Sequence, residues 1–397
     1  MIQDIRFKIL AIGYVIVAIC LFFYSFTQVD LGLTLSQWSY WQVFQKFFQH
    51  IGYFDRPLST GFYITIITLL FIFYGIFLYK AHKNILKEKS IWKLIFVIST
   101  ILFFAYNAFS YDLFNYIFDA KIVTFYHQNP YQHRAFDYPG NPMLGFMHWT
   151  ERTYPYGPVW LLATIPFSFS GFRLLLPTIM LFKGIEFVSF LGTVFFLEKI
   201  LQKISPQNVL FGTILFAFNP LVLIEGLVSA HNDMFMMFLG VFSLYLLIQK
   251  KYAFSFLTLL LSIGVKFATV FLIPIYGLIE FFILKKKKIN YELIFLITTA
   301  IMILPVIFAT LRITYQPWYL LYVLPFAALS VKKYFIVIPV FVMSLFSLFD
   351  YIPFLYTGNW NTPIPTILFY LHITGIFLSL FFSFIFFLRR SSSNVLQ

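Results

Sequence analysis

Apolar runs long enough to cross a bilayer recur along the whole chain, and they restrict the fold more than any other feature. A membrane-spanning helix needs about 20 consecutive apolar residues. Only 11% of the 397 residues are charged, whereas soluble domains carry about 25%. The sequence therefore predicts an all-α polytopic membrane protein, with residues 1–397 forming one integral-membrane domain.

Basic residues gather in short breaks between the apolar runs, for example at 80–89, 285–288 and 389–390. Such clusters beside apolar helices mark the cytoplasmic side of a membrane. The net charge of +13 is then explained by orientation in the lipid bilayer, and no nucleic-acid partner is expected. The chain is predicted to be a multi-pass protein of the cell (inner or plasma) membrane with both termini cytoplasmic.

Placing every basic cluster on the cytoplasmic side gives about 12 transmembrane helices, and counts of 11–13 also fit. The expected helices lie near 9–29, 61–80, 91–110, 176–198, 209–224, 234–249, 252–265, 267–284, 291–310, 318–330, 334–350 and 364–388. The run 157–169 contains two prolines and is expected to be a re-entrant or partial helix. Two long extracytoplasmic loops, about 30–60 and 111–156, are expected to bear amphipathic helices.

A first polar group lies in the stretch SAHND, residues 229–233. His231, Asn232 and Asp233 follow Glu225 at the predicted outer boundary of the membrane. Asn232 or Asp233 could simply cap the next helix, but a cap does not account for Glu225 and His231. Ionisable groups at such a position are candidates for function.

A second polar group lies in the stretch SYDLFNYIFDAKIV, which begins at Ser110. On a helix, Asp112, Asn115 and Asp119 share one face. The alternative is an amphipathic helix on the membrane surface with a wet polar face. Carboxylates and amides bind sugar hydroxyls, and aromatic rings pack against the apolar face of a sugar, so this pattern favours sugar binding.

Isolated cations complete the set. Lys266 lies within a long apolar stretch, so it needs an anionic partner unless its side chain extends to the lipid headgroups. Arg312 precedes Gln316 and Trp318, and the last two are also typical of an interfacial anchor. The sequence has no Gly-rich phosphate loop and no zinc motif. A divalent metal is allowed but not indicated, and no other cofactor is expected.

Six motifs then resemble a known family. SYDLFNYIFDAKIV, QNPY, TYPYGPVW, NPLVLIEGLVSAHND, GVKFATVFLIP and QPWYLLYVLP occur in the order seen in GT-C glycosyltransferases. Over about residues 100–330 the chain resembles the bacterial polyprenol-phosphomannose-dependent mannosyltransferases. The resemblance implies a GT-C-like fold and transfer of a hexose, with mannose favoured, from a polyprenyl-phosphate donor. The acceptor would be a glycan or glycolipid on the extracytoplasmic face, and the reaction would invert the anomeric carbon.

The resemblance also implies roles for residues. Asp112 or Asp119 would be the general base, and Lys266, with Arg312 or His231, would bind the donor phosphate. Sugar and acceptor would contact Asn115, Asn129, Tyr131, Tyr154, Tyr156, Glu225, Asn232, Asp233, Gln316 and Trp318. Many relatives carry the base in an Asp-x-Asp motif of the first outer loop. That loop here offers only Asp30 and Asp55, so the base stays open among four residues.

The competing hypothesis is a transporter or flippase of a lipid-linked saccharide. Transporters place polar groups near the bilayer midplane, in two related halves. Glu186, near the middle of an expected helix, favours the transporter hypothesis. The gathering of the other polar groups at one face, and the lack of matching halves, favour the enzyme.

Overall fold

The computed structural model describes residues 2–330 and 333–395, and no strand occurs within these ranges. The helices are α1 (Ile2–Ser25), α2 (Ser39–Phe54), α3 (Arg56–His82), α4 (Glu88–Phe103), α5 (Asp112–Thr124), α6 (Pro158–Ser170), α7 (Leu175–Ile204), α8 (Val209–Ala217), α9 (Pro220–Leu223), α10 (Asp233–Ile248), α11 (Tyr252–Val265), α12 (Ile273–Leu284), α13 (Tyr291–Ile301), α14 (Ile303–Arg312), α15 (Leu324–Leu329), α16 (Tyr334–Phe349), α17 (Tyr351–Thr357) and α18 (Ile364–Val395). A π-helical turn (Ile224–Val228) follows α9, and the longer 3₁₀ segments are Phe267–Leu272 and Pro317–Tyr322.

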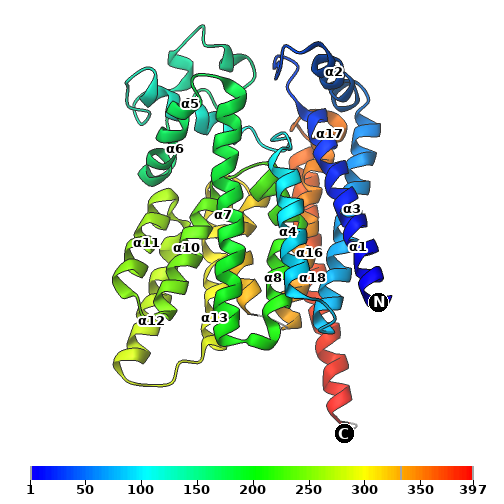
Figure 1. Cartoon of the computed structure of the whole chain (residues 1–397), viewed down its shortest axis with the longest axis vertical. Helices are drawn as coiled ribbons and strands as arrows, with labels where there is room; N and C mark the ends of the chain where they lie inside the picture. Colours follow the sequence, from blue (N-terminus) through cyan, green and yellow to red (C-terminus); the bar gives the residue numbers. More distant parts are fainter. Residues whose placement is uncertain (1, 331–332, 396–397) are drawn as a thin grey trace.

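Different helices lie at the two ends of the long axis of the molecule (Figure 1). The long helices α3 and α7 run along this axis, and α2 and α5 lie at the same end, on opposite sides of the molecule. The two marked termini and the connection between α12 and α13 lie toward the opposite end. The two predicted loops at 30–60 and 111–156 do carry helices, α2 and α5.

The all-helical prediction is confirmed, but the predicted count of 12 spans is not. Within the described residues, seven helices are long and apolar enough to cross a membrane, or eight if one bent pair is a single span. The runs expected at 234–249 and 252–265 form helices of only 16 and 14 residues. The run expected at 318–330 becomes a short 3₁₀ and α segment, Pro317–Leu329. These three segments are apolar but shorter than the roughly 20 residues of a membrane-spanning helix, so hydropathy alone does not establish 12 spans.

The bent pair marks a break in one membrane-depth helix. The segment ending at Ala217 and the segment Pro220–Val228 meet at 54°. Pro220 has no N–H and cannot continue the hydrogen-bond ladder. The side chain of Asn219 instead accepts from the backbone N–H of Leu221 at 2.9 Å and so caps the new segment.

Buried tyrosines bind the backbone carbonyls on the near side of this break. The Tyr74 hydroxyl donates to the Leu215 carbonyl at 2.7 Å, and the Tyr14 hydroxyl donates to the Phe218 carbonyl at 3.0 Å. Both tyrosine rings are fully buried. An unpaired carbonyl away from water costs free energy comparable to a lost hydrogen bond. These two tyrosines remove that cost for the Leu215 and Phe218 carbonyls and so stabilise the break.

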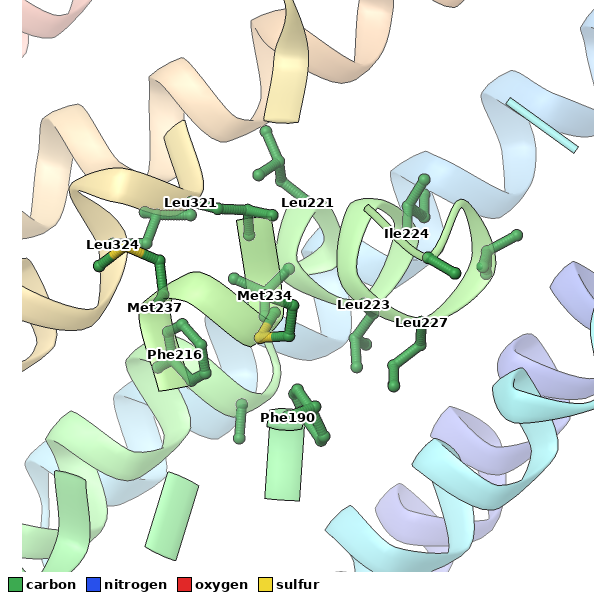
Figure 2. Close-up of a cluster of buried hydrophobic side chains, with 14 of the residues drawn as sticks. Phe190, Phe216, Leu221, Leu223, Ile224, Leu227, Met234, Met237, Leu321 and Leu324 are labelled. Carbon is green, nitrogen blue, oxygen red and sulfur yellow. The ribbon is translucent and has the colours of Figure 1, made fainter. Parts of the chain in front are cut away.

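An apolar cluster encloses the segment beyond the break (Figure 2). Leu221, Leu223 and Leu227 of the broken helix are fully or almost fully buried beside Met234 of α10. Leu321 and Leu324, from the 3₁₀ segment and α15, lie on another side of the same cluster. The cluster fixes the segment that carries Glu225 in a dry environment.

Two glycines allow α6 to approach the end of α11. The Gly157 N–H donates to the Val265 carbonyl at 3.0 Å. A Cβ at Gly157 would lie 2.1 Å from the carbonyl oxygen of Gly264, and a Cβ at Gly264 would lie 2.5 Å from Val159. Only glycine permits this contact, which brings the TYPYGPVW motif beside Lys266.

We therefore expect Gly157→Ala to separate α6 from α11. Forced overpacking typically costs about 1–3 kcal/mol, and the shift would move Tyr156 away from Lys266. Thermal unfolding in detergent measures the loss of stability. Gly184→Ala is the matched control, because a Cβ there meets nothing within 4 Å. Equal stability of the two variants would contradict the close-contact explanation.

Candidate active site

Three ionisable side chains from different elements form a line. The His231 Nε2 lies 3.3 Å from Glu225 Oε2, and the His231 Nδ1 lies 3.7 Å from Asp112 Oδ2. Glu225 and His231 are fully buried, whereas the Asp112 side chain is 13% exposed. The line therefore runs from the interior to an accessible carboxylate.

Local backbone features place each member. Glu225 lies in the π-helical turn after the broken helix, and such turns are frequent at functional sites. Ala230 has a φ of +57°, which turns the chain so that His231 follows immediately. Asp112 is the first residue of α5, where the helix dipole favours a negative charge.

Asp112 is held by two tyrosines and an arginine. The hydroxyls of Tyr156 and Tyr116 donate to Asp112 Oδ2 at 3.2 and 3.5 Å. The Arg152 guanidinium lies 3.6 Å from Asp112 Oδ1 and donates to the Tyr156 hydroxyl at 3.3 Å. The Tyr116 hydroxyl also lies 3.3 Å from Asn232 Oδ1, so α5 is tied directly to the SAHND stretch.

Two cations border the ring of Tyr156. Lys266 Nζ lies 5.7 Å and the Arg152 guanidinium 5.8 Å from the ring centroid. Lys266 also bonds both carboxylate oxygens of Asp233, at 2.8 and 3.0 Å. The predicted anionic partner of Lys266 is therefore Asp233. The Lys266 side chain remains 24% exposed.

An aromatic ring covers the histidine. Trp318 stacks on His231 with ring centroids 4.1 Å apart. Glu225 accepts a hydrogen bond at Oε1 from the Tyr351 hydroxyl at 2.8 Å. Stacking fixes the plane of the imidazole, which explains why its short contacts to the two carboxylates are not aligned as hydrogen bonds.

Buried polar atoms without a hydrogen-bond partner concentrate here. The described residues contain 16 such side-chain atoms. Six of them belong to two stretches of this site: Asn115 Oδ1, Glu225 Oε2, Ser229 Oγ, both ring nitrogens of His231, and Asn232 Nδ2. Buried polar groups in native proteins are normally paired, so this concentration indicates a place that binds polar groups from outside the chain.

Asp119 shares the Asp112 face of α5, as predicted, but its environment differs. It is 8% exposed, and burial raises the pKa of Asp119 to about 8, while Arg152 opposes the rise and Asp112 adds to it. The third member of this face, Asn115, donates to the Trp149 carbonyl at 3.4 Å. Asp119 is thus largely protonated at neutral pH.

Three other predicted residues support the loop that carries Tyr156. Asn129 accepts from the N–H of Tyr131 in a local turn, and the hydroxyl of Tyr131 donates to the Tyr156 carbonyl at 3.2 Å. Tyr154 is buried and donates to the Gly157 carbonyl at 3.0 Å. These three side chains are used to build the loop that carries Tyr156.

Arg312 and Gln316 also make no contact with the site residues among the described interactions. Arg312 is exposed at the end of α14. Gln316 donates to the hydroxyl of Thr314, its near neighbour, at 3.0 Å. Their predicted roles in phosphate and sugar binding remain predictions.

The alternative explanation of the SAHND stretch as a helix cap is wrong for these side chains. Asn232 occupies the N-cap position of α10 but makes no side-chain capping bond, and Asp233 is engaged by Lys266. Glu186 of α7 instead accepts from the N–H of Phe235 at 3.1 Å. The residue that favoured a transporter therefore stabilises the start of α10.

The acids of the first long loop have different environments. Asp55 caps α3, with its carboxylate accepting from the N–H of Leu58 at 3.3 Å. Asp30 accepts from the N–H of Gly32 at 2.7 Å, and its charge contributes to raising the pKa of Tyr111, which is raised mainly by burial. Because Tyr111 directly precedes Asp112, Asp30 remains a candidate for the base, whereas Asp55 has a structural role.

Sequence reasoning missed three contributors. Arg152 directly precedes the motif TYPYGPVW, and Tyr116 is four residues after Asp112, a spacing that puts it on the same helix face. Tyr351 follows far along the chain, and no local pattern connects it to Glu225. Within the described ranges no group of three or more His, Cys, Asp or Glu residues is arranged to hold a metal ion.

The environment of Asp119 predicts a pH-dependent stability. Its folded-state pKa of about 8 lies above the ordinary 3.8, so the folded protein holds the proton more tightly between these values. The stability of wild type relative to Asp119→Asn should fall as pH rises through this window, by up to about 1.4 kcal/mol per pH unit. Thermal unfolding of both proteins between pH 5 and pH 8 measures the difference.

Asp137→Asn serves as the control, because the pKa of Asp137 is lowered by its bond to the Arg134 backbone and the carboxylate stays ionised throughout. A constant difference between wild type and Asp119→Asn across this pH range would show that Asp119 is not a protonated buried acid.

The ion pair of Lys266 and Asp233 predicts non-additive variants. Lys266→Met leaves the buried Asp233 carboxylate without its partner, which should cost about 3 kcal/mol. Adding Asp233→Asn should recover part of that loss, and a double-mutant cycle measures the coupling. Lys333→Met is the control, because its partner Glu292 is 63% exposed and surface pairs contribute about 0–1 kcal/mol. Additive losses at Lys266 and Asp233 would refute the coupling.

The chain matches the model of one protein family. A family model of MptA/B, described as alpha-(1->6)-mannopyranosyltransferase, N-terminal domain, matches residues 15–281. The matched region contains the line Asp112, His231 and Glu225 and the pair of Asp233 and Lys266, whereas Trp318 and Tyr351 lie beyond it. No curated protein and no solved structure matches the chain.

The match covers well over half of the chain, and it confirms the resemblance drawn from the six motifs. The chain belongs to the alpha-(1->6)-mannopyranosyltransferase family MptA/B, a polyprenol-phosphomannose-dependent GT-C family, and it is an enzyme of the mannosyltransferase type.

Proposed function

We propose that the protein transfers mannose from a polyprenyl-phosphate donor to a glycan or glycolipid acceptor at the extracytoplasmic face of the membrane. The observation that carries this proposal is the convergence of a partly exposed carboxylate, Asp112, with two cations, Arg152 and Lys266, around Tyr156. A glycosyl transfer from a lipid phosphate needs a base for the acceptor and positive charge for the departing phosphate.

Asp112 is the favoured general base. Burial raises the pKa of Asp119 to about 8, which disfavours Asp119 as the base, and Asp112 is the more accessible of the two. A carboxylate that takes the proton of the acceptor hydroxyl typically accelerates a reaction by about 10²–10⁴. His231 lies behind Asp112 at 3.7 Å, where it can share the proton that Asp112 receives.

Arg152 and Lys266 are the favoured phosphate ligands. In the displacement, the bond between the anomeric carbon and the phosphate oxygen breaks, and both bonding electrons leave with the phosphate. Cations fixed where this charge develops are the main electrostatic contribution to such a reaction. Arg152 is favoured in this role because its guanidinium lies 3.6 Å from Asp112, and Arg312 remains a predicted helper.

A single displacement with inversion fits this set. In this step the acceptor hydroxyl gives its proton to Asp112 and its oxygen attacks the anomeric carbon, while Arg152 and Lys266 stabilise the departing phosphate. Trp149 is 60% exposed beside Arg152, whose guanidinium lies 5.6 Å from its ring centroid, so this ring is available to pack against a sugar. Asn232 Nδ2 and Ser229 Oγ are fully buried and unpaired, and they supply polar atoms beneath this group.

The sidedness follows from the basic clusters. The connection 285–288 between α12 and α13 lies toward the end opposite α5 (Figure 1). If that end is cytoplasmic by the positive-inside rule, the Asp112 end of the bundle faces out. Both termini are then cytoplasmic, and a lipid-carried donor is the one that reaches such a site.

The test is direct transfer by the purified full chain in lipid nanodiscs. We expect radiolabelled mannose to move from polyprenyl phosphomannose to an α-mannoside acceptor, and not from GDP-mannose. Asp112→Asn should lower kcat about 10²–10⁴-fold, and Asp137→Asn, on an exposed turn, should not change it. Digestion with a linkage-specific mannosidase identifies the bond formed.

Asp30→Asn is assayed in parallel. Loss of transfer in Asp30→Asn with full activity in Asp112→Asn would move the base to the first loop. Movement of intact donor across vesicles without any transfer would overturn the enzymatic proposal.

A further inference from the structure

The α5 helix has a second functional face. A helix advances roughly 100° per residue, so Ile117, Lys121 and Phe125 lie about half a turn away from Asp112 and Asp119. This second face borders a cavity of about 460 Å³. The cavity is separated from Asp112 and His231 by the body of α5.

Four segments enclose the cavity. Besides α5, these are the turn around Asn141–Phe146, the end of α6 at Ser168, and the first turn of α7 at Leu175 and Thr178. Thr124 and Ser168 join α5 to α6 by a hydroxyl–hydroxyl bond of 2.9 Å. The cavity therefore has walls that are fixed to one another.

Two cations meet at the cavity without an acid. Arg173 lies 4.6 Å and Lys121 5.5 Å from the centroid of the Phe125 ring. Neither makes an ion pair with any carboxylate in the described part of the chain. Burial and the neighbouring Arg173 charge lower the pKa of Lys121. Two like charges held together in this way favour an anionic ligand.

An unusual turn positions Arg173. Phe172 and Arg173 have φ values of +50° and +64°, which non-glycine residues rarely adopt. The Leu174 N–H donates to the Gly171 carbonyl at 2.9 Å and closes the turn. The turn places the guanidinium over Phe125, within reach of Lys121.

The rim of the cavity is apolar and exposed. Phe169, Phe172 and Leu174 are 59%, 80% and 60% exposed. They lie where α7, a candidate membrane span, begins. Exposed apolar side chains at the end of a spanning helix fit contact with lipid chains rather than with water.

We propose that this cavity binds the phosphate head of a membrane lipid phosphomonoester, at a site separate from the Asp112 group. A phosphomonoester carries about −1.5 to −2 charges at pH 7, which matches Lys121 and Arg173, whereas a phosphodiester carries one. The apolar rim holds the chain of the lipid. The spent polyprenyl phosphate left by mannose transfer is one lipid of this class.

Binding to the full chain in neutral phosphatidylcholine nanodiscs tests the proposal. The probes are farnesyl phosphate, a short-chain phosphatidylglycerol and inorganic phosphate, titrated by microscale thermophoresis. We expect saturable binding of farnesyl phosphate, weakened at least about tenfold in the double variant Lys121→Gln, Arg173→Gln. Lys83→Gln is the matched control, because Lys83 lies over the Tyr79 ring at 5.9 Å and far from the cavity in sequence.

The outcomes separate this site from the reaction centre. Asp112→Asn should lose mannose transfer and keep farnesyl phosphate binding. Loss of binding in Asp112→Asn, or unchanged binding in the double variant with its fold intact by thermal unfolding, would overturn the proposal. Equal affinity for phosphatidylglycerol would exclude selection for a monoester, and equal affinity for inorganic phosphate would exclude a lipid.

Discussion

The break at Asn219 and Pro220 is the constraint on which the site depends. A continuous helix through this depth would present apolar side chains all round and would leave no place for Glu225. The hydroxyls of Tyr14 and Tyr74 bind carbonyls at the break, so the chain can leave its first axis and re-form as a short segment ending in a π-helical turn. Glu225 and His231 follow from that redirection.

The α5 helix connects this buried segment to the outer loops. Its first face carries Asp112 and Asp119 toward the redirected segment, and Tyr116 bonds Asn232 across the contact. Its second face carries Lys121 to the cavity at α6 and α7. A helix with polar groups on both sides is poorly described as amphipathic, which explains why a surface helix with one wet face was a reasonable but incomplete prediction.

Local patterns in the sequence predicted the parts of the site that depend on helix geometry. The spacing of Asp112, Asn115 and Asp119 fixed their common face, and the cost of burying polar groups in an apolar chain identified Glu225 and His231. The same reasoning could not predict the raised pKa of Asp119, because burial is a property of the packed chain.

Local sequence patterns could not predict contacts between segments that lie far apart in the chain. Tyr351 lies 126 residues from Glu225, and nothing in its own neighbourhood distinguishes it from an interfacial tyrosine. Arg152 and Arg312 are both cations of predicted outer segments, and no local pattern distinguishes the one that lies beside Asp112. The charge near Asp112 could be assigned to one of them only from the folded loop.

The lengths of α10 and α11 bear on both the number of spans and the position of the site. The α10 and α11 helices have 16 and 14 residues, and each contributes to the Lys266 and Asp233 pair at one of its ends. The start of α10 is fully buried, and its free backbone groups there need polar partners. Glu186 supplies one at the start of α10. Once polar side chains are required at such a depth, ionised groups can pair among themselves instead of facing lipid. Short helices therefore provide the polar interior that a mannosyltransferase site of this kind requires.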